Sequence, residues 1–112
     1  MDTVAENVAR QRLESTLPKW RVEGGQLVRT YRTGDWRRTN LLAGAIAFLA
    51  EAAYHHPDLE VGFPQLTVRL TSHDAGGITE RDLELARLIE ERVTWRPGHG
   101  SIFTGPPDGW IE

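Results

Sequence analysis

Three of the four histidines in this chain occupy positions where acid–base chemistry is possible. His55 and His56 are adjacent at the expected end of a helix, and His73 ends the clearest strand pattern. Imidazole titrates near neutral pH, so a histidine can donate or accept a proton under ordinary conditions. Glu51 lies four residues before His55, and this spacing would place the carboxylate and the ring on one helix face. The pattern favours general acid–base catalysis.

The same side chains also have simpler structural interpretations. A histidine at a helix C-terminus interacts favourably with the helix dipole, so His55 or His56 could be a cap. Asp82 follows Thr79 by three residues, which is the spacing of a reciprocal capping box. A three-histidine metal site is a further alternative. However, adjacent histidines seldom point at one ion, and the spacing matches no HExxH-type pair, so we expect no metal.

Length and composition restrict the class of protein. The chain has 112 residues, 39% hydrophobic and 26% charged, which is typical of one folded domain. The absence of cysteine excludes disulfides, zinc–thiolate sites and cysteine nucleophiles. A net charge of −3 argues against a nucleic-acid partner. The longest apolar run, residues 41–50, is far shorter than the ~20 residues that cross a bilayer, and the N-terminus does not resemble a secretory signal. We therefore expect a cytoplasmic protein with no membrane partner.

Hydrophobic periodicity and turn residues predict seven elements. Helices are expected over residues 4–16, 36–54 and 80–93, and strands over 20–23, 26–32, 59–63 and 66–72. Thr3, with Glu6 in a capping box, Asp35 and Thr79 are the expected N-caps of the three helices. Gly24 and Gly25 supply the positive φ angles that a tight hairpin needs between the first two strands.

The apolar residues predict how these elements pack. The core face of the middle helix is expected to be Leu42, Ile46, Leu49 and Ala53, and that of the third helix Leu83, Ala86, Ile89 and Val93. In the fourth strand apolar residues alternate with polar ones such as Thr67 and Arg69, which indicates one buried face. The order α-β-β-α-β-β-α thus predicts an α+β fold, a four-stranded antiparallel sheet with helices packed on one face. The bare face would be solvated or paired, so we expect a homo-oligomer.

Residues 94–112 differ in composition from the rest of the chain. They contain four Gly and three Pro, which interrupt regular structure, together with four large apolar side chains, Trp95, Ile102, Phe103 and Trp110. These side chains predict that the segment docks on the domain or on a neighbouring subunit. We therefore divide the chain into a domain, residues 1–93, and a C-terminal tail, residues 94–112.

One set of polar and aromatic residues resembles the signature of the pterin-4a-carbinolamine dehydratases. The set is Glu51, His55-His56-Pro57, Phe63, His73 and Asp82, with three, five, nine and eight residues between successive members. The wider similarity covers about residues 10–93 and includes Trp20 and the stretch from Gly76 to Asp82. The family fold is α+β, with four antiparallel strands and helices on one face, which agrees with the predicted order of elements.

The resemblance implies a hydro-lyase that dehydrates 4a-hydroxytetrahydrobiopterin to quinonoid dihydropterin without metal or cofactor. It implies that the catalytic residues are His55, His56 and His73, and that the substrate-binding or supporting residues are Glu51, Pro57, Phe63 and Asp82. We expect the three rings to converge on one cleft. His56 and His73 would act on the 4a-hydroxyl and ring protons, and His55 would hold the polar edge of the pterin. The expected assembly is a homo-dimer or homo-tetramer.

Two departures from the family pattern favour a second interpretation. Leu59 stands where an aromatic residue is common, and Phe63-Pro64 replaces a frequent Tyr-Asn, so the pterin pocket could be reshaped. Some proteins with this fold resemble pterin dehydratases but are RuBisCO assembly factors without dehydratase activity. The aromatic tail fits such a binding role. The alternative is therefore a non-catalytic protein that acts as an assembly factor or other protein-binding partner.

Overall fold

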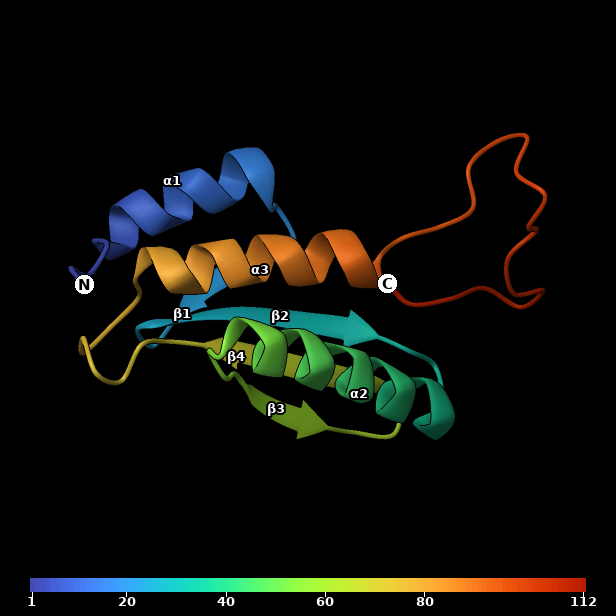
Figure 1. Ribbon diagram of the computed structural model, residues 1–112, viewed down its shortest axis with the longest axis horizontal. Coiled ribbons are helices and arrows are strands. Elements are labelled where there is room, and N and C mark those ends of the chain that lie inside the picture. The colour runs from blue at the N-terminus through green and yellow to red at the C-terminus, as the bar shows by residue number, and fades with distance from the viewer.

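The computed structural model describes all 112 residues and contains the predicted elements in the predicted order (Figure 1). They are α1 (Glu6–Thr16), β1 (Arg21–Glu23), β2 (Gln26–Arg32), α2 (Trp36–Ala53), β3 (Asp58–Val61), β4 (Gln65–Leu70) and α3 (Glu80–Val93). The strands form one antiparallel sheet in the order β1-β2-β4-β3. The predicted α+β fold is confirmed. No helix is both long enough and apolar enough to cross a membrane.

One face of the sheet forms the floor of the core. Leu27 and Tyr31 of β2 lie opposite Leu70 and Leu66 of β4, and all four side chains are fully buried. Buried hydrophobic residues from all three helices belong to the same cluster as these strand residues, so the helices cover this face. Each fully buried Leu or Ile side chain contributes roughly 1.5–3 kcal/mol relative to exposure. The central pair, β2 and β4, therefore holds the sheet against all three helices.

The outer face of the sheet is polar and ion-paired. Arg69 lies 3.8 Å from Glu23 on one side and 3.5 Å from Glu60 on the other, and Thr30 and Thr67 share a hydrogen bond between them. The charged side chains of this face keep contact with water, whereas Thr67 and Val28 on the same face are buried. Pairing of subunits through the sheet stays a prediction.

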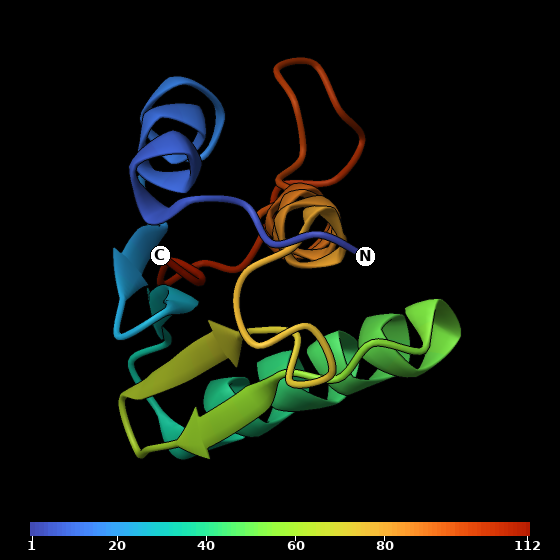
Figure 2. The same ribbon diagram turned by 90° about the vertical axis from the view of Figure 1, so that its left-hand side faces the viewer.

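The expected N-caps are confirmed for α2 and α3 but not for α1. The Asp35 side chain accepts a hydrogen bond from the Arg38 amide at 2.8 Å, and Thr79 forms a full capping box with Asp82. The cap predicted at Thr3 is wrong, because α1 begins at Glu6 and Ala5 occupies the N-cap position without a side-chain bond. The amide of Val4 instead donates to the Ile78 carbonyl at 2.7 Å, so the N-terminal segment runs along the loop before α3 (Figure 2).

The core face of α2 differs at its C-terminal end from the predicted stripe. Leu42 and Ile46 are buried as expected, but Leu49 is half-buried and Ala53 is exposed, while Ala50 is buried instead. The buried residues Leu42, Ile46 and Ala50 are spaced four residues apart, and they lie on the face of α2 that packs against β3, β4 and α3. The final turn of the helix therefore leaves the core just before the adjacent histidines.

The C-terminal tail turns back and joins the domain at its end. Ile111 is part of the hydrophobic core, and the Glu112 amide donates to the Arg32 carbonyl at 2.8 Å. Arg38 bonds Asp108 at 2.5 Å and stacks over the Trp110 ring at 5.5 Å. The expected docking on the domain thus holds for this end of the tail. The middle of the tail, residues 97–107, forms a loop that stands clear of the helices and strands (Figure 1).

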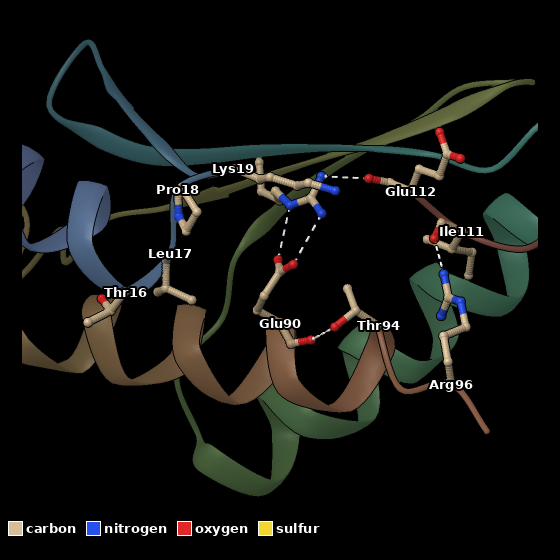
Figure 3. A pocket seen from close by; sticks show the side chains of 10 residues that line it. Thr16, Leu17, Pro18, Lys19, Glu90, Thr94, Arg96, Ile111 and Glu112 are labelled. Atoms are coloured by element: carbon tan, nitrogen blue, oxygen red, sulfur yellow. Dashed lines mark hydrogen bonds and ion pairs between the residues drawn. The ribbon is translucent and has the colours of Figure 1, made fainter. Parts of the chain in front are cut away.

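A polar network lies beneath the returning tail and lines a hollow of about 410 Å³ (Figure 3). The Glu90 carboxylate accepts hydrogen bonds from Arg29 at 3.0 and 3.2 Å, from the Tyr31 hydroxyl at 2.7 Å and from the Trp20 indole at 2.9 Å. Arg29 also donates to the Glu112 carbonyl at 3.0 Å, the bond that ends at Glu112 in Figure 3. Burial acts to raise the pKa of Glu90, but the donors from Arg29, Tyr31 and Trp20 together outweigh burial and lower it.

This network predicts a specific loss of stability in acid. Because the folded pKa of Glu90 lies below the unfolded value near 4.5, its stabilisation is complete above about pH 4.5 and is lost as the pH falls through the folded pKa. Glu90→Gln should lower the free energy of unfolding at pH 7 by about 2–4 kcal/mol, since Arg29 is left buried without its counter-charge. Its free energy of unfolding should then vary less than that of the wild type below pH 4.5. Urea titrations across pH measure this, with Glu91→Gln on the exposed side of α3 as control. Equal acid slopes in wild type and Glu90→Gln would contradict the interpretation.

The contribution of the tail to stability can be measured separately. Ile111→Ala removes a side chain that is 97% buried in the core, so unfolding should become easier by about 2 kcal/mol or more. Val8→Ala, on the exposed side of α1, should change stability by less than about 0.5 kcal/mol. Thermal and urea unfolding of both variants provide the comparison. If Ile111→Ala is as stable as Val8→Ala, the tail is not part of the folded core.

Candidate active site

The end of α2 separates the two adjacent histidines. Tyr54 adopts a left-handed conformation with φ of 53°, which is uncommon for a residue other than glycine. Its amide donates to the Glu51 carbonyl and the His55 amide donates to the Ala50 carbonyl, each at 3.1 Å. These two bonds define a Schellman motif, and Pro57 prevents the helix from resuming at His56. The helix has therefore ended before His55.

This turn changes the partner of Glu51. The expectation that Glu51 and His55 share a helix face is wrong, because the last helical residue is Ala53. Glu51 instead contacts the second histidine, with its Oε1 atom 2.8 Å from Nε2 of His56. Both side chains are exposed, and the Tyr54 ring lies edge-on to the His56 ring at 5.2 Å. An exposed pair of this kind is held weakly, so the ring can turn toward a ligand.

His55 is held by a buried carboxylate. Its Nε2 atom lies 2.6 Å from Oδ1 of Asp82, and the Asp82 side chain has no solvent exposure. The other carboxylate oxygen accepts hydrogen bonds from the Ser72 hydroxyl at 2.9 Å and from the Thr79 amide at 2.8 Å. Asp82 is therefore both the capping residue of α3 and the partner of a histidine. The two interpretations of Asp82 that the sequence left open are compatible.

The sheet register brings His73 to the same end of the molecule. Asp58 of β3 pairs with Arg69 of β4 in antiparallel register, so the chain before β3 and the chain after β4 lie at one end of this hairpin. His55 and His56 precede β3, and His73 follows β4. Ser72, the residue before His73, bonds Asp82 directly. His73 itself is exposed and makes no side-chain hydrogen bond.

The loop that carries His73 is fixed at both ends. A β-bridge joins Ser72 to Gly77, and Gly76 takes a φ of 82° while its amide donates to the Ser72 carbonyl at 2.9 Å. Arg81 of α3 donates to both carboxylate oxygens of Asp74 at 2.9 Å. These hydrogen bonds lower the pKa of Asp74, which therefore remains charged beside His73. The loop is held against the N-terminus of α3.

Phe63 does not join the histidines. It lies in the turn between β3 and β4, at the opposite end of this hairpin, where its carbonyl accepts a hydrogen bond from Thr39 at 3.2 Å. Four residues of extended β3 plus the flanking turns separate it from His56 by roughly 15 Å. The residue is 64% exposed. Pro57 is half-buried directly after His56, where it supports the turn rather than presenting a polar group.

His55 lines a hollow that His56 and His73 do not line. His55 contributes to an open hollow of about 340 Å³, whose other residues are Met1, Ala53, Glu80, Arg81, Glu84, Leu85 and Leu88. His56 and His73 are not among its lining residues, so the three rings share an end of the fold but not one enclosed cleft. No group of three or more His, Asp or Glu side chains is arranged as a set of metal ligands.

Sequence reasoning missed Ser72 and Arg81 as members of the site. Thr79 and Asp82 were recognisable as a pair from their spacing, but the position of Ser72 depends on how the loop to Gly77 closes. No periodic or capping pattern marks that closure. The Ser72 hydroxyl also bonds the Thr79 hydroxyl at 2.8 Å, which completes the buried set around Asp82.

Comparison with known proteins agrees with this arrangement. The family model described as pterin 4 alpha carbinolamine dehydratase matches residues 2–92. A protein of Aquifex aeolicus named "Putative pterin-4-alpha-carbinolamine dehydratase" is 44% identical over 90 residues, covering 80% of this chain and 90% of that protein. A protein of Chloroflexus aurantiacus with the same name is 40% identical over 88 residues, 79% of this chain and 88% of that protein.

Two solved structures share the fold. A transcriptional coactivator/pterin dehydratase from Brucella melitensis superposes with a TM-score of 0.71 at 24% identity, covering 80% of this chain and 97% of that one. A pterin dehydratase-like protein described as a RuBisCO assembly factor in the alpha-carboxysome superposes with a TM-score of 0.55 at 22% identity, covering 65% and 87%. The match of sequence and architecture over nearly all of residues 2–92 shows that this chain belongs to the pterin-4-alpha-carbinolamine dehydratase family.

Proposed function

We propose that this protein is a hydro-lyase that converts 4a-hydroxytetrahydrobiopterin to quinonoid dihydropterin. The observation that carries the proposal is the pairing of His55 with the buried Asp82 at the end of the fold that also presents His56 and His73. A histidine fixed by a buried carboxylate is a common arrangement for proton transfer. If His55 were only a helix cap, its role would not require two more exposed imidazoles at the same end of the fold.

The chemistry requires two proton movements. The substrate carries a hydroxyl on C4a, next to a ring N–H. A proton must reach the hydroxyl so that the C–O bond breaks and water leaves. The neighbouring N–H must lose its proton so that its electron pair forms the C=N bond of the product. One imidazolium and one neutral imidazole can perform these steps, each typically worth about 10²–10⁴-fold. The protons balance, and no oxidant or reductant is consumed.

The geometry supports a division of roles among the histidines. The bond from Nε2 of His55 to Asp82 leaves Nδ1 as the nitrogen that exchanges a proton with substrate. We therefore assign proton transfer to His55, which pairs with Asp82, and to His73, which directly follows Ser72, the other side chain that bonds Asp82. His56, with its exposed ring and the neighbouring Glu51, is assigned to the polar edge of the pterin. The sequence alone favoured the opposite roles for His55 and His56.

The direct experiment generates the 4a-carbinolamine and follows its dehydration with and without the protein. We expect a rate above the spontaneous reaction that increases in proportion to protein concentration. His55→Ala and His73→Ala should each lower kcat by about 10²-fold or more. His56→Ala should raise KM with a smaller change in kcat. His99→Ala, in the tail, is the matched control. Equal effects of His55→Ala and His99→Ala would refute the assignment.

Asp82 should act as a positioning residue for His55. Asp82→Asn replaces the carboxylate by an amide that favours a different imidazole tautomer, so kcat should fall by about 10²-fold with little change in KM. Because Asp82 also caps α3, Thr79→Val is the control: it removes hydroxyl contacts of the cap but keeps the His55–Asp82 pair. Thr79→Val should lose about 1 kcal/mol of stability and keep its kcat. If both variants lose the same activity when compared at equal folded fraction, Asp82 is only structural.

A second candidate function is a non-catalytic, protein-binding role. The observation in its favour is the exposed loop 97–107 with Ile102 and Phe103, outside the residues that the family model matches. Failure of the folded protein to accelerate dehydration would favour this candidate over the enzyme. Acceleration that survives Phe103→Ala would favour the enzyme.

A further inference from the structure

The hollow beside His55 has an apolar side and a charged side. The apolar side is formed by four side chains from three segments of the chain, Met1, Ala53, Leu85 and Leu88. Leu85 is buried among the core residues of α3, whereas Met1 is 71% exposed. Met1 is also the only methionine of the chain. The N-terminal residue therefore takes part in a hollow whose other walls belong to α2 and α3.

The charged residues of this hollow already have partners. Each of them forms an ion pair with a neighbouring side chain: Glu80 with Arg12, Arg81 with Asp74 and Glu84 with Arg87. A ligand that entered the hollow would therefore meet no unpaired charge from these groups. What remains for the ligand is the ring of His55 and an apolar wall. Such a lining suits a neutral, flat heterocycle with a polar edge better than it suits an ion.

The N-terminal segment holds Met1 at this hollow. The Val4 amide donates to the Ile78 carbonyl at 2.7 Å, so the segment runs beside the loop that leads into α3 (Figure 2). A Cβ atom at Gly77 would lie 3.4 Å from Cγ2 of Thr3, so Thr3 packs closely on this glycine. Three extended residues span at most about 11 Å, which limits how far Met1 can move from the Val4 contact. The chain thus tethers a flexible thioether at the edge of the hollow.

We propose that Met1 is a specificity-determining residue of this site, and that its thioether packs on the face of the flat ligand that exchanges a proton with His55. The inference rests on the proposed hydro-lyase function and adds to it a contact from the N-terminal segment. Methionine is unbranched and polarisable, so it adapts to an aromatic surface, and a sulfur–aromatic contact typically changes affinity by about 2–10-fold. The contact favours a planar ring system over a small polar molecule.

Selective oxidation of Met1 tests the contact. The chain has one Met and no Cys, so dilute hydrogen peroxide has a single sulfur to attack. The thioether sulfur gains one oxygen and is oxidised by two electrons, and the peroxide is reduced to water. Because the sulfoxide is polar, KM for the 4a-carbinolamine should rise about 3–10-fold while kcat changes by less than about two-fold. Methionine sulfoxide reductase should restore the original KM.

Protein made with norleucine in place of methionine is the matched control. Norleucine keeps an unbranched apolar side chain but has no sulfur, so its KM should be the same before and after peroxide treatment. Mass spectrometry checks that the Met1 protein has gained one oxygen. A KM that peroxide leaves unchanged in the Met1 protein would overturn the inference. An equal rise of KM in the norleucine protein would also overturn it, because the damage would then lie elsewhere.

A measurement without turnover separates this inference from the proposed function. In the free protein, oxidation of Met1 should shift the nuclear magnetic resonance signals of the His55 ring but not those of His99, because Met1 and His55 line one hollow. Unchanged His55 signals would overturn the inference whatever the activity of the protein.

The same method follows the ligand. An isotopically labelled methionine methyl group gives a single signal in this chain. Titration with a stable dihydropterin analogue should shift this signal and those of His55 along one saturation curve. A methyl signal that stays in place while His55 shifts would overturn the contact with Met1 and leave the proposed function standing. If the analogue shifts neither signal, the proposed function fails and the contact fails with it.

Discussion

The candidate site depends on one buried charge, the carboxylate of Asp82. A carboxylate removed from water is costly unless donors surround it, and here they come from three separate segments. The Thr79 amide belongs to the start of α3, the Ser72 hydroxyl to the loop after β4, and the His55 ring to the turn after α2. The need to satisfy one carboxylate thus draws together the ends of three elements that are distant in sequence. Each donor that was lost would leave part of the charge unpaired, so the stability of α3 and the position of His55 are coupled.

This constraint also explains why two adjacent histidines have different environments. The left-handed turn at Tyr54 directs the chain out of α2, after which His55 meets a buried partner and His56 an exposed one. A fixed ring is suited to proton transfer, where misplacement is costly, and a free ring to adjusting around a ligand. The opposite end of the molecule has its own buried ion pair, Arg29 with Glu90, which fastens the returning tail. The candidate site and the attachment of the returning tail therefore depend on separate polar networks of one fold.

Most of the fold could be predicted because the helices and strands that short sequence patterns favour are the ones present in the tertiary structure. Glycine pairs and caps such as Asp35 each determine structure over a few residues, and those predictions are confirmed. The alternation in β4 correctly predicted that Leu66, Val68 and Leu70 are buried, but Thr67 between them is buried as well. The failures occurred where a distant contact decides the outcome. Thr3 is not a cap because the Val4 amide is bound by the Ile78 carbonyl. Glu51 contacts His56 because the helix ends at Ala53, two residues before His55. The motif named His55 and Asp82 as candidates, but the buried set around Asp82 depends on loop closure at Ser72 that no local pattern encodes.

The central claim is that the rings of His55, His56 and His73 serve one ligand. Nuclear magnetic resonance can test it directly, because the chain has only four histidines and the imidazole signals of all of them can be assigned. Titration with a stable dihydropterin analogue should shift the signals of His55, His56 and His73 along one saturation curve. The signals of His99 in the tail should not move. Unchanged signals for the first three histidines, or shifts that follow different saturation curves, would contradict a shared pterin site.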